Sequence, residues 1–458
     1  MGEEKLTGKL ILKGRLNLKT PLIIGSGESD VADIVVLKDL KGKPYIPATS
    51  FVGLLRHYFE EGIDDNTKKT INKNKQLDYF WGSTEADGYQ SALMCNDLKT
   101  QDEPKIKVRD GVAIDHKKGI AKKRAKFDYE VVESGIGFDL NMEISIREAY
   151  DKEIFKRILK TIVDALKVGD IRVGAMATKG FGECKLEDIR CYEFDFSKKE
   201  DVIRWLNGEL GKGQELSVEP FPIKPKEFLI DAWFKIKSSL IIKSYSDELE
   251  APDAVHISSK DNPILPGTSL KGVIRDRAIR IINTLERNGE EAIKPLFGWI
   301  DIDEEKKNEK YKSRIIVNET IINNTIEEIQ RRIKIDRFTG GTIKGALFDS
   351  TPLWTMNGDK AVHIIMKINN YEDWEAGLLL LILKDLWNGD LPIGGEKNVG
   401  RGILKGLEAA IRIGKDEGKI KQNDDKLVFE GIEPNRFEEL VSQFVEYTNN
   451  QKEKLDAE

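Results

Sequence analysis

The sequence contains few cysteines and no long apolar run, and both absences restrict the class of protein it encodes. Cys95, Cys184 and Cys191 are its only cysteines and form no CxxC pair, which argues against a disulfide framework or a structural zinc site. No stretch approaches the about 18 apolar residues of a membrane-spanning helix. The opening residues, MGEEKLTGKL, have no apolar signal region. We therefore expect a cytoplasmic protein with no membrane partner.

Histidine is scarce and positive charge is not in excess. The four histidines, at positions 57, 116, 256 and 363, show no metal-ligand spacing, and the sequence has no Gly-x-Ser-x-Gly or His-Glu-x-x-His motif. The 73 basic and 79 acidic residues give a net charge of −6. This balance opposes an extended nucleic-acid surface unless basic residues cluster locally.

Three sequence blocks occur twice, in the same order and at spacings of 219 to 221 residues. The paired blocks are residues 46–56 with 265–275, 115–128 with 336–349, and 169–182 with 389–402. Such self-similarity predicts two homologous domains, residues 1–225 and 226–458, and 458 residues are sufficient for two cores. Residues 207–227 are rich in Gly, Pro and Lys and are interpreted as the linker. The residues after about 408 form an acidic C-terminal extension.

Each half alternates strand and helix patterns. Residues 10–18 and 229–237 partly alternate in polarity, as half-buried strands do, and residues 154–168 and 374–387 are helical segments that end at a glycine. The hydroxyl groups of Thr49 or Ser50, and of Thr268 or Ser269, are suited to N-cap an earlier helix. We predict an α+β fold of tandem ferredoxin-like (RRM-like) domains with insertions.

Carboxylates follow the first strand of each half. Asp33 ends residues 25–33, and Asp253 ends residues 247–253, which also contain Asp247, Glu248 and Glu250. Acidic loops are commonly only solvated surface. A carboxylate in both copies can also orient a hydroxyl group or hold a divalent metal near a scissile phosphate. Asp33 and Asp253 are therefore the candidate catalytic residues and metal ligands.

Glycine-rich and basic segments are repeated as well. Residues 173–182 and 393–402 would let backbone lie close to a phosphate chain, or would simply form tight turns. Residues 105–126 and 331–344 carry local charges of +7 and +4, which suit a protruding basic loop on nucleic acid or a solvated face. The candidate RNA-binding residues in these segments are Lys117, Lys122, Lys123, Arg124, Lys126, Gly174, Lys179, Gly180, Gly182, Arg337, Lys344, Gly394, Lys397, Gly400 and Arg401.

Taken together, these blocks resemble the RAMP superfamily, the backbone family of type III CRISPR effector complexes. The resemblance rests on the duplicated Pro-x-Thr-Ser-x-x-Gly-x-x-Arg motif, on the glycine-rich loops, and on Asp33 followed by Ile-Val-Val-Leu-Lys-Asp-Leu-Lys-Gly-Lys-Pro-Tyr-Ile-Pro. Two such units in one chain are similar to the type III-D architecture. The resemblance covers nearly the whole chain apart from the acidic extension.

The resemblance implies a function. It implies binding of CRISPR guide RNA and complementary target RNA beside other CRISPR effector subunits, with thumb-like hairpins at about residues 110–131 and 335–352. It also implies metal-dependent endoribonuclease cleavage of the target, with Mg²⁺ or Mn²⁺, at an aspartate that Asp33 matches directly and Asp253 matches through the repeat. The shared motif adds Ser50, Arg56, Ser269, Lys271 and Arg275 to the candidate RNA-binding residues.

Departures from the family pattern leave alternatives open. Ala48 stands where the second half has Gly267, and Val52 where it has Lys271, so the first half is expected to hold the guide less tightly. One alternative is an RNA-binding scaffold with no chemistry. Another is a guide-processing RAMP nuclease with a histidine base, although His57 has Asp276 as its counterpart in the second half.

Overall fold

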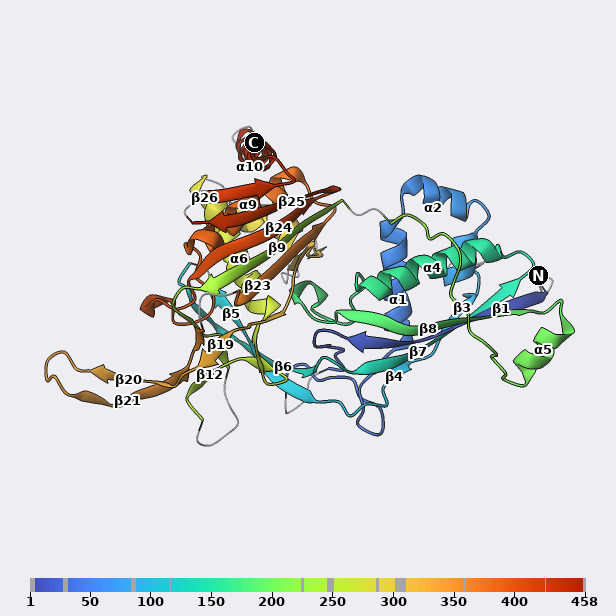
Figure 1. Ribbon diagram of the computed structural model, residues 1–458, viewed down its shortest axis with the longest axis horizontal. Helices are drawn as coiled ribbons and strands as arrows, with labels where there is room; N and C mark the ends of the chain where they lie inside the picture. Colours follow the sequence, from blue (N-terminus) through green and yellow to red (C-terminus); the bar gives the residue numbers. More distant parts are fainter. Residues whose placement is uncertain are drawn as a thin grey trace. The chain divides into compact units, whose positions relative to one another are not determined.

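The computed structural model describes residues 5–27, 32–83, 88–115, 117–223, 226–244, 251–285, 288–300, 310–356, 360–424 and 426–455 (Figure 1). The chain forms two compact units. The first contains residues 1–109, 127–177 and 181–224, and the second contains residues 110–126, 178–180 and 225–458. The division therefore falls after residue 224, but two short segments of the first repeat group with the second unit.

The first unit is built on an antiparallel sheet with the strand order β2-β4-β7-β1-β8, and β3 also pairs with β7. The strands are β1 (Leu6–Leu18), β2 (Tyr45–Ile46), β3 (Leu93–Cys95), β4 (Leu98–Lys99), β7 (Gly137–Arg147) and β8 (Cys184–Asp195). Alternate residues of β1, including Leu10, Leu12 and Leu16, are buried. The predicted strand at residues 10–18 is confirmed, because its alternation places one face against a core.

Helices cover one face of this sheet, as the view in Figure 1 shows for α1 and α4. The helices of the unit are α1 (Ala48–Gly62), α2 (Asp65–Asn72), α3 (Gln76–Trp81), α4 (Lys152–Val168) and α5 (Lys199–Leu206). Asp151 caps the start of α4, and Gly169, at φ 89°, ends it as predicted. Part of the expected linker is packed rather than loose, because the N–H of Phe221 donates to Thr161 Oγ1 on α4 and Phe221 is buried.

The second unit repeats this plan, with the sheet order β17-β23-β9-β24-β25-β26. Its strands are β9 (Glu227–Ile236), β17 (Ile315–Val317), β23 (Val362–Asn369), β24 (Leu404–Ile413), β25 (Asp416–Asn423) and β26 (Lys426–Glu430). Its helices are α6 (Gly267–Thr284), α7 (Gly289–Ala292), α8 (Lys294–Phe297), α9 (Asp373–Asn388) and α10 (Pro434–Leu455). The predicted strand at 229–237 and the predicted helix at 374–387 are both confirmed.

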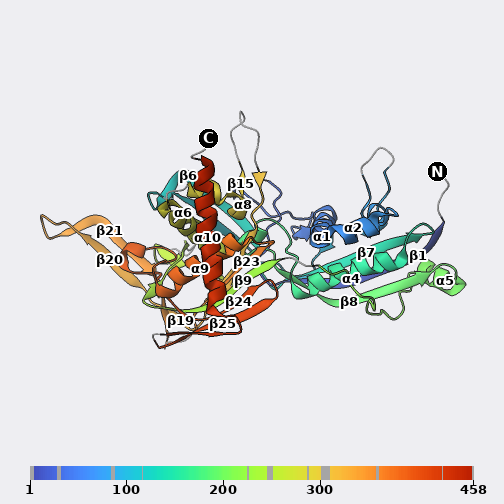
Figure 2. The ribbon, with the colours of Figure 1, turned by 90° about the horizontal axis from the view of Figure 1, so that it is seen from above.

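The acidic C-terminal extension is ordered structure in this unit. It supplies the end of β24, then β25, β26 and α10, and α10 lies beside α9 in Figure 2. Tyr447 stacks on Trp374 with 4.1 Å between ring centroids, while Leu440 and Phe444 are buried in the core. A Cβ on Gly377 of α9 would overlap the Leu440 carbonyl group, so the helices pack closely. The extension therefore completes the second core.

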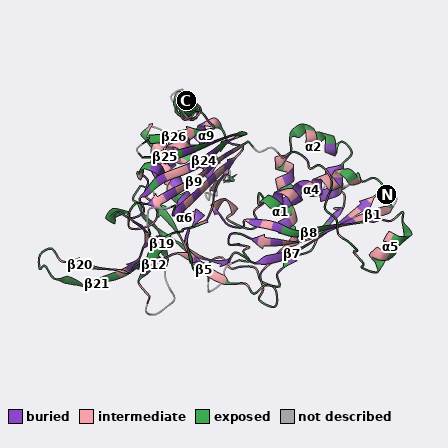
Figure 3. Ribbon diagram, in the orientation of Figure 1, coloured by how far each residue is buried: buried purple, intermediate pink, exposed green. Residues whose placement is uncertain are grey.

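Two long hairpins are inserted in the chain, one in each repeat. The first is β5 (Ile106–Asp115) with β6 (Ile120–Val132), and the second is β20 (Gln330–Ile335) with β21 (Thr342–Thr351). Figure 1 shows β20 and β21 extending away from the main sheet of the second unit, and Figure 3 shows them as mostly exposed. The second hairpin begins at Gln330, five residues before the predicted range at 335–352, because the basic residues Arg331, Arg332 and Lys334 are part of its first strand.

The remaining strands form small sheets in the second unit. They are β10 (Ser239–Leu240), β11 (Lys243–Ser244), β12 (Ala254–His256), β13 (Ser258–Ser259), β14 (Asn262–Leu265), β15 (Trp299–Ile300), β16 (Lys310–Tyr311), β18 (Thr320–Ile321), β19 (Thr325–Glu327) and β22 (Leu353–Thr355). The sheet with the order β11-β12-β21-β20 joins the second hairpin to the segment that follows Asp253.

Two local expectations are settled by the structure. The N-caps of α1 and α6 are Pro47 and Pro266, with no side-chain cap bond, so the predicted hydroxyl caps are wrong. Proline is favoured near helix starts because it has no N–H to satisfy and its φ is already suitable. The cysteines are free, and burial raises the pKa of Cys184 to about 12, which agrees with an inert thiol. No helix in the described ranges is both long and apolar enough to span a membrane.

Candidate functional sites at the bases of two hairpins

Asp33 lies against the return strand of the first hairpin. Its Oδ2 accepts a hydrogen bond of 2.9 Å from the backbone N–H of Asp128 on β6. The next residue, Ile34, forms a parallel bridge with Tyr129, and the Ile34 carbonyl group accepts from the Glu130 N–H at 2.8 Å. The Asp33 side chain is exposed. A short parallel ladder therefore joins the candidate loop to the hairpin base.

Asp253 has the same environment in the second unit. Its Oδ2 accepts from the backbone N–H of Asp349 on β21 at 3.0 Å, and the side chain is exposed. Ala254 and Val255 of β12 then pair in parallel with Ser350 and Thr351. The four residues Asp33, Asp128, Asp253 and Asp349 thus form two equivalent pairs at the repeat spacing.

The sequence comparison had aligned Asp128 with Asp349 but had given them no role. The signal was present, because these residues end the third repeated block. What was missing was the fold, which brings that block beside the carboxylate loop. Asp30, Asp247, Glu248 and Glu250, which share the acidic loops, lie outside the described residues.

The residues at the second site fit a divalent metal only in part. Asp349 meets the Asp253 carboxylate through its backbone N–H, while its own carboxylate pairs with Arg331 at 3.6 Å and keeps a buried Oδ1 that has no hydrogen-bond partner among the described residues. No group of three or more His, Cys, Asp or Glu side chains within the described ranges is arranged to hold a metal. Mg²⁺ is commonly held by one or two carboxylates together with substrate phosphates and water. The described residues alone therefore supply too few ligands for a metal, and a bound ion would need oxygen atoms from outside the protein.

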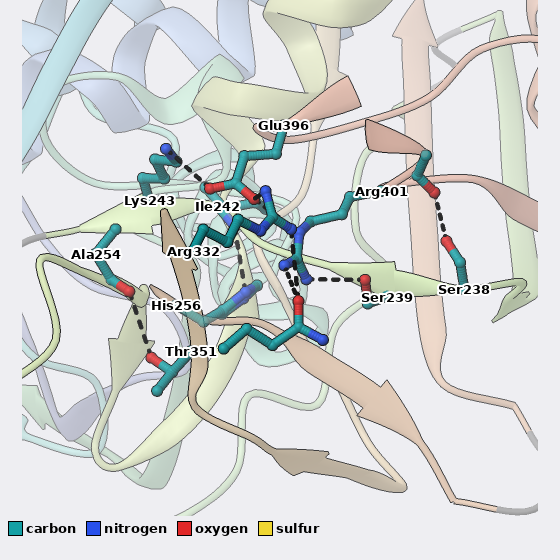
Figure 4. Close-up of polar contacts among 12 residues, drawn as sticks. Ser238, Ser239, Ile242, Lys243, Ala254, His256, Arg332, Thr351, Glu396 and Arg401 are labelled. Atoms are coloured by element: carbon teal, nitrogen blue, oxygen red, sulfur yellow. Dashed lines mark hydrogen bonds and ion pairs between the residues drawn. The ribbon is translucent and has the colours of Figure 1, made fainter. Parts of the chain in front are cut away.

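His256 ends β12 and links that strand to two neighbouring segments. Its Nδ1 accepts from the Ile242 N–H at 3.2 Å (Figure 4), and its Nε2 lies 3.0 Å from the Ile264 carbonyl oxygen. Burial lowers the pKa of His256 to about 4. The ring is therefore neutral at physiological pH and acts as a structural cross-link, not as a general base.

A partly buried ionic cluster anchors the second hairpin to the glycine-rich loop (Figure 4). Glu396 forms ion pairs with Arg401 at 2.8 Å, Arg332 of β20 at 2.8 Å and Lys243 of β11 at 3.1 Å. Burial would raise the pKa of Glu396, but these three cations outweigh it and hold the pKa below its usual value. We call these four residues the Glu396 cluster.

Arg401 completes the Glu396 cluster from inside the protein. It is 2% exposed, and its guanidinium group also donates to Ser239 Oγ at 2.9 Å and to Gln330 Oε1 of β20 at 2.5 Å. Arg401 was expected to contact RNA. In the structure its donors are instead used to hold the hairpin strand β20, because the side chain points into the unit.

The first unit has apolar residues at the repeat positions of Glu396 and Arg401, beside a buried ion pair between Arg109 of β5 and Glu133. Met176 and Phe181, 220 residues before Glu396 and Arg401, pack with Ile23, Tyr129 and Val131. The ring of Tyr129 meets that of Phe181 edge to face at 6.0 Å. Apolar residues of similar volume can replace a buried ion pair at little cost. The two units therefore reach one geometry by different chemistry.

Most glycines of the glycine-rich loops are required by the protein itself. At Gly174 and Gly394 a Cβ would overlap the carbonyl oxygens of Ile23 and Ile241, and Gly182 and Gly402 are equally crowded. All four have positive φ. Gly400 differs, because nothing lies within 4 Å of its Cβ position although φ is 84°. Gly400 is therefore not required by close packing, and its carbonyl group accepts from Ser238 Oγ at 2.6 Å.

Lys271 has a structural position. It is 6% exposed, and its Nζ donates to Ser313 Oγ at 2.7 Å and to the Ile315 carbonyl group at 2.9 Å. Burial, with a smaller effect of nearby Lys179, lowers the pKa of Lys271 to about 7. The expected phosphate contact is therefore replaced by contacts that close the end of β17. Val52, its counterpart, needs no such partners.

The remaining candidate RNA-binding residues lie mostly on the surface. Those with exposed side chains or backbone are Ser50, Arg56, Lys117, Lys122, Lys123, Arg124, Lys126, Gly174, Arg337, Lys344, Lys397 and Gly400. Arg56 pairs with Glu60 at 2.9 Å, and Lys126 pairs with Asp110 at 3.0 Å. Ser269, Arg275 and Lys179 are half-buried, and Gly180 is buried. The basic residues thus remain available chiefly on the two hairpins.

Comparison with known families gives the class of the protein. A model described as the RAMP superfamily matches residues 15–185 and residues 233–405. These matches cover more than half of the chain and fall once in each repeat, so the chain belongs to the RAMP superfamily, and the predicted duplication is confirmed. The chain is also 26% identical over 210 residues to the CRISPR system Cms endoribonuclease Csm3 of Methanocaldococcus jannaschii. This match covers 40% of the present chain and 81% of that protein.

Proposed function

We propose that this protein is a guide-RNA-binding backbone subunit of a type III CRISPR effector that cuts complementary target RNA once per repeat. Its proposed location is the cytoplasm, and its partners are guide RNA, target RNA and other CRISPR effector subunits. The observation that carries the proposal is the pair of repeat-related carboxylates, Asp33 and Asp253, each exposed at the base of a hairpin. Membership of the RAMP superfamily and similarity to a CRISPR endoribonuclease support it.

The hairpins β5–β6 and β20–β21 are proposed to act as the thumbs that bend the RNA. Their basic residues neutralise phosphates without reading sequence, and several apolar side chains near the second tip are exposed, such as Ile335 and Phe338. An exposed aromatic ring at a hairpin tip is suited to stack on an unpaired base. The strand orders β8-β1-β7 in the first unit and β24-β9-β23 in the second support the ferredoxin-like assignment of the two cores.

The proposed chemistry is in-line attack by a 2′-hydroxyl group on the adjacent phosphate. The bent RNA places the 2′-oxygen opposite the 5′-oxygen, so one bond to phosphorus forms as the other breaks, and a 2′,3′-cyclic phosphate results. Asp33 and Asp253 would hold Mg²⁺ or Mn²⁺ against that phosphate. A bound metal would stabilise the negative charge that develops there.

Single substitutions in the assembled complex test this proposal. Asp33→Asn and Asp253→Asn keep side-chain shape but remove charge, so each should abolish one product from an end-labelled target while binding stays unchanged. Asp261→Asn is a matched control, because Asp261 is exposed and lies at φ 63°, which asparagine tolerates well. A chelator should reproduce the double variant. An unchanged product ladder in the double variant would leave only the scaffold function.

A further inference from the structure

The aspartates occupy a specific place in the ladder between loop and hairpin. In the second unit, pairing of β12 with β21 begins at Ala254 and Ser350, and Asp253 and Asp349 stand one residue before that start. In the first unit, Asp33 and Asp128 stand one residue before the bridge of Ile34 with Tyr129. The carboxylate of each loop aspartate thus accepts a hydrogen bond from the backbone N–H that lies just before the first paired residue of the hairpin strand.

The direction of this amide group follows from strand geometry. Asp349 faces Arg331 across the antiparallel pair of β21 and β20. Its N–H donates to Asp253, so it points away from β20 and is not part of that pairing. The carboxylate oxygen takes the place that a backbone carbonyl group would occupy if β12 were longer. The arrangement caps the ladder with a charge-assisted hydrogen bond.

We propose that the backbone N–H groups of Asp128 and Asp349 are positioning groups for the carboxylates of Asp33 and Asp253, so that each hairpin sets the position of its own cutting carboxylate. This inference rests on the proposed function and adds a dependence of cleavage on the hairpin base. The acceptor oxygen is held by β6 or β21, while the exposed side chain stays accessible to RNA. RNA that engages a hairpin therefore engages the strand that orients the carboxylate.

Hydrogen exchange without RNA tests the positioning bond directly. Asp253→Asn keeps an acceptor oxygen and Asp253→Ala does not, so the Asp349 amide should exchange at least tenfold faster in the alanine variant than in the asparagine variant. The wild-type protein should match the asparagine variant. Equal exchange in all three proteins would overturn the proposal. This result does not depend on cleavage, so it separates the positioning bond from the proposed nuclease activity.

Cleavage by the assembled complex tests the consequence. Asp349→Pro removes the N–H, whereas Asp349→Ala removes only the side chain, so the proline variant should cut at the second site at least tenfold more slowly than the alanine variant. Leu347→Pro is the matched control for a proline in the same strand, because alternation points the N–H of Leu347 to the same edge as that of Asp349, before the β12 pairing begins. It should retain cleavage. Equal rates for the proline and alanine variants at position 349 would overturn the proposal.

Discussion

Replacement of Arg401 with methionine should destabilise the second unit by about 3 kcal/mol. Arg401 is 2% exposed and pairs with Glu396, whose side chain is 11% exposed. Removal of one member of a buried ion pair costs roughly 3–5 kcal/mol, because the other charge stays buried. The lower end applies here, since Arg332 and Lys243 would still pair with Glu396.

The first unit supplies the matched control for this substitution. The double variant Glu396→Met with Arg401→Phe reproduces Met176 and Phe181, which fill the equivalent positions. No carboxylate is then left buried, so the double variant should be more stable than Arg401→Met by at least about 2 kcal/mol. Ser239 Oγ still loses its donor, so part of the wild-type stability should remain lost.

Urea unfolding followed by hydrogen exchange and mass spectrometry measures these differences. Peptides from β24 and α9 report on the second unit, and peptides from β1 and α4 report on the first. Separate readings are needed because two units need not unfold in one two-state transition. The first-unit peptides should not change. A double variant as unstable as Arg401→Met, or an Arg401→Met protein as stable as wild type, would refute the reasoning about the Glu396 cluster.

Three further predictions follow from single features of the structure. The pKa of His256 is lowered from 6.5 to about 4 in the folded protein, so the unfolded chain binds the proton at a higher pH. About 3 kcal/mol of stability should therefore be lost as the pH falls from 6.5 to 4. His256→Gln should reduce this loss when unfolding by urea is measured at several pH values. Gly402→Ala should prevent folding of the second unit, because its Cβ would overlap the Ile393 carbonyl group, whereas Gly400→Ala should cost only about 1–2 kcal/mol by circular dichroism melting. Alanine at five basic positions of the first hairpin should weaken binding of unrelated RNA sequences equally and flatten the salt dependence in filter-binding assays, and a sequence-selective loss would contradict this. Those positions are Lys117, Lys122, Lys123, Arg124 and Lys126.

The sequence predicted the main elements well because their signals are local. Alternation identified β1 and β9, and a glycine in the left-handed region ended α4 and α9 as expected. The residues predicted to cap α1 and α6 were wrong, because a proline and not a hydroxyl residue is the N-cap of each helix. The packing of residues around Phe221 and of α10 was not foreseen, because it depends on contacts with distant helices.

The candidate site was predictable only where it repeats in sequence. Asp33 and Asp253 were found because both copies carry them, and the same comparison aligned Asp128 with Asp349 without showing that they approach. The buried positions of Lys271 and Arg401 could not be predicted, since a basic residue in a glycine-rich or helical motif has the same sequence pattern whether it faces phosphate or a carbonyl group.

The difference between the two supports indicates which features carry the function. The hairpin base is held by Glu396 and Arg401 in one unit and, in the other, by Met176 and Phe181 with Arg109 over the Phe181 ring. A feature that varies so freely is needed only for stability. The hydrogen bond from the hairpin amide to the loop aspartate is present in both units at 2.9 and 3.0 Å. The two units thus differ in the residues that support the hairpin base but share the arrangement around the exposed carboxylate. Substitution of that carboxylate is therefore the change that should separate RNA cleavage from RNA binding.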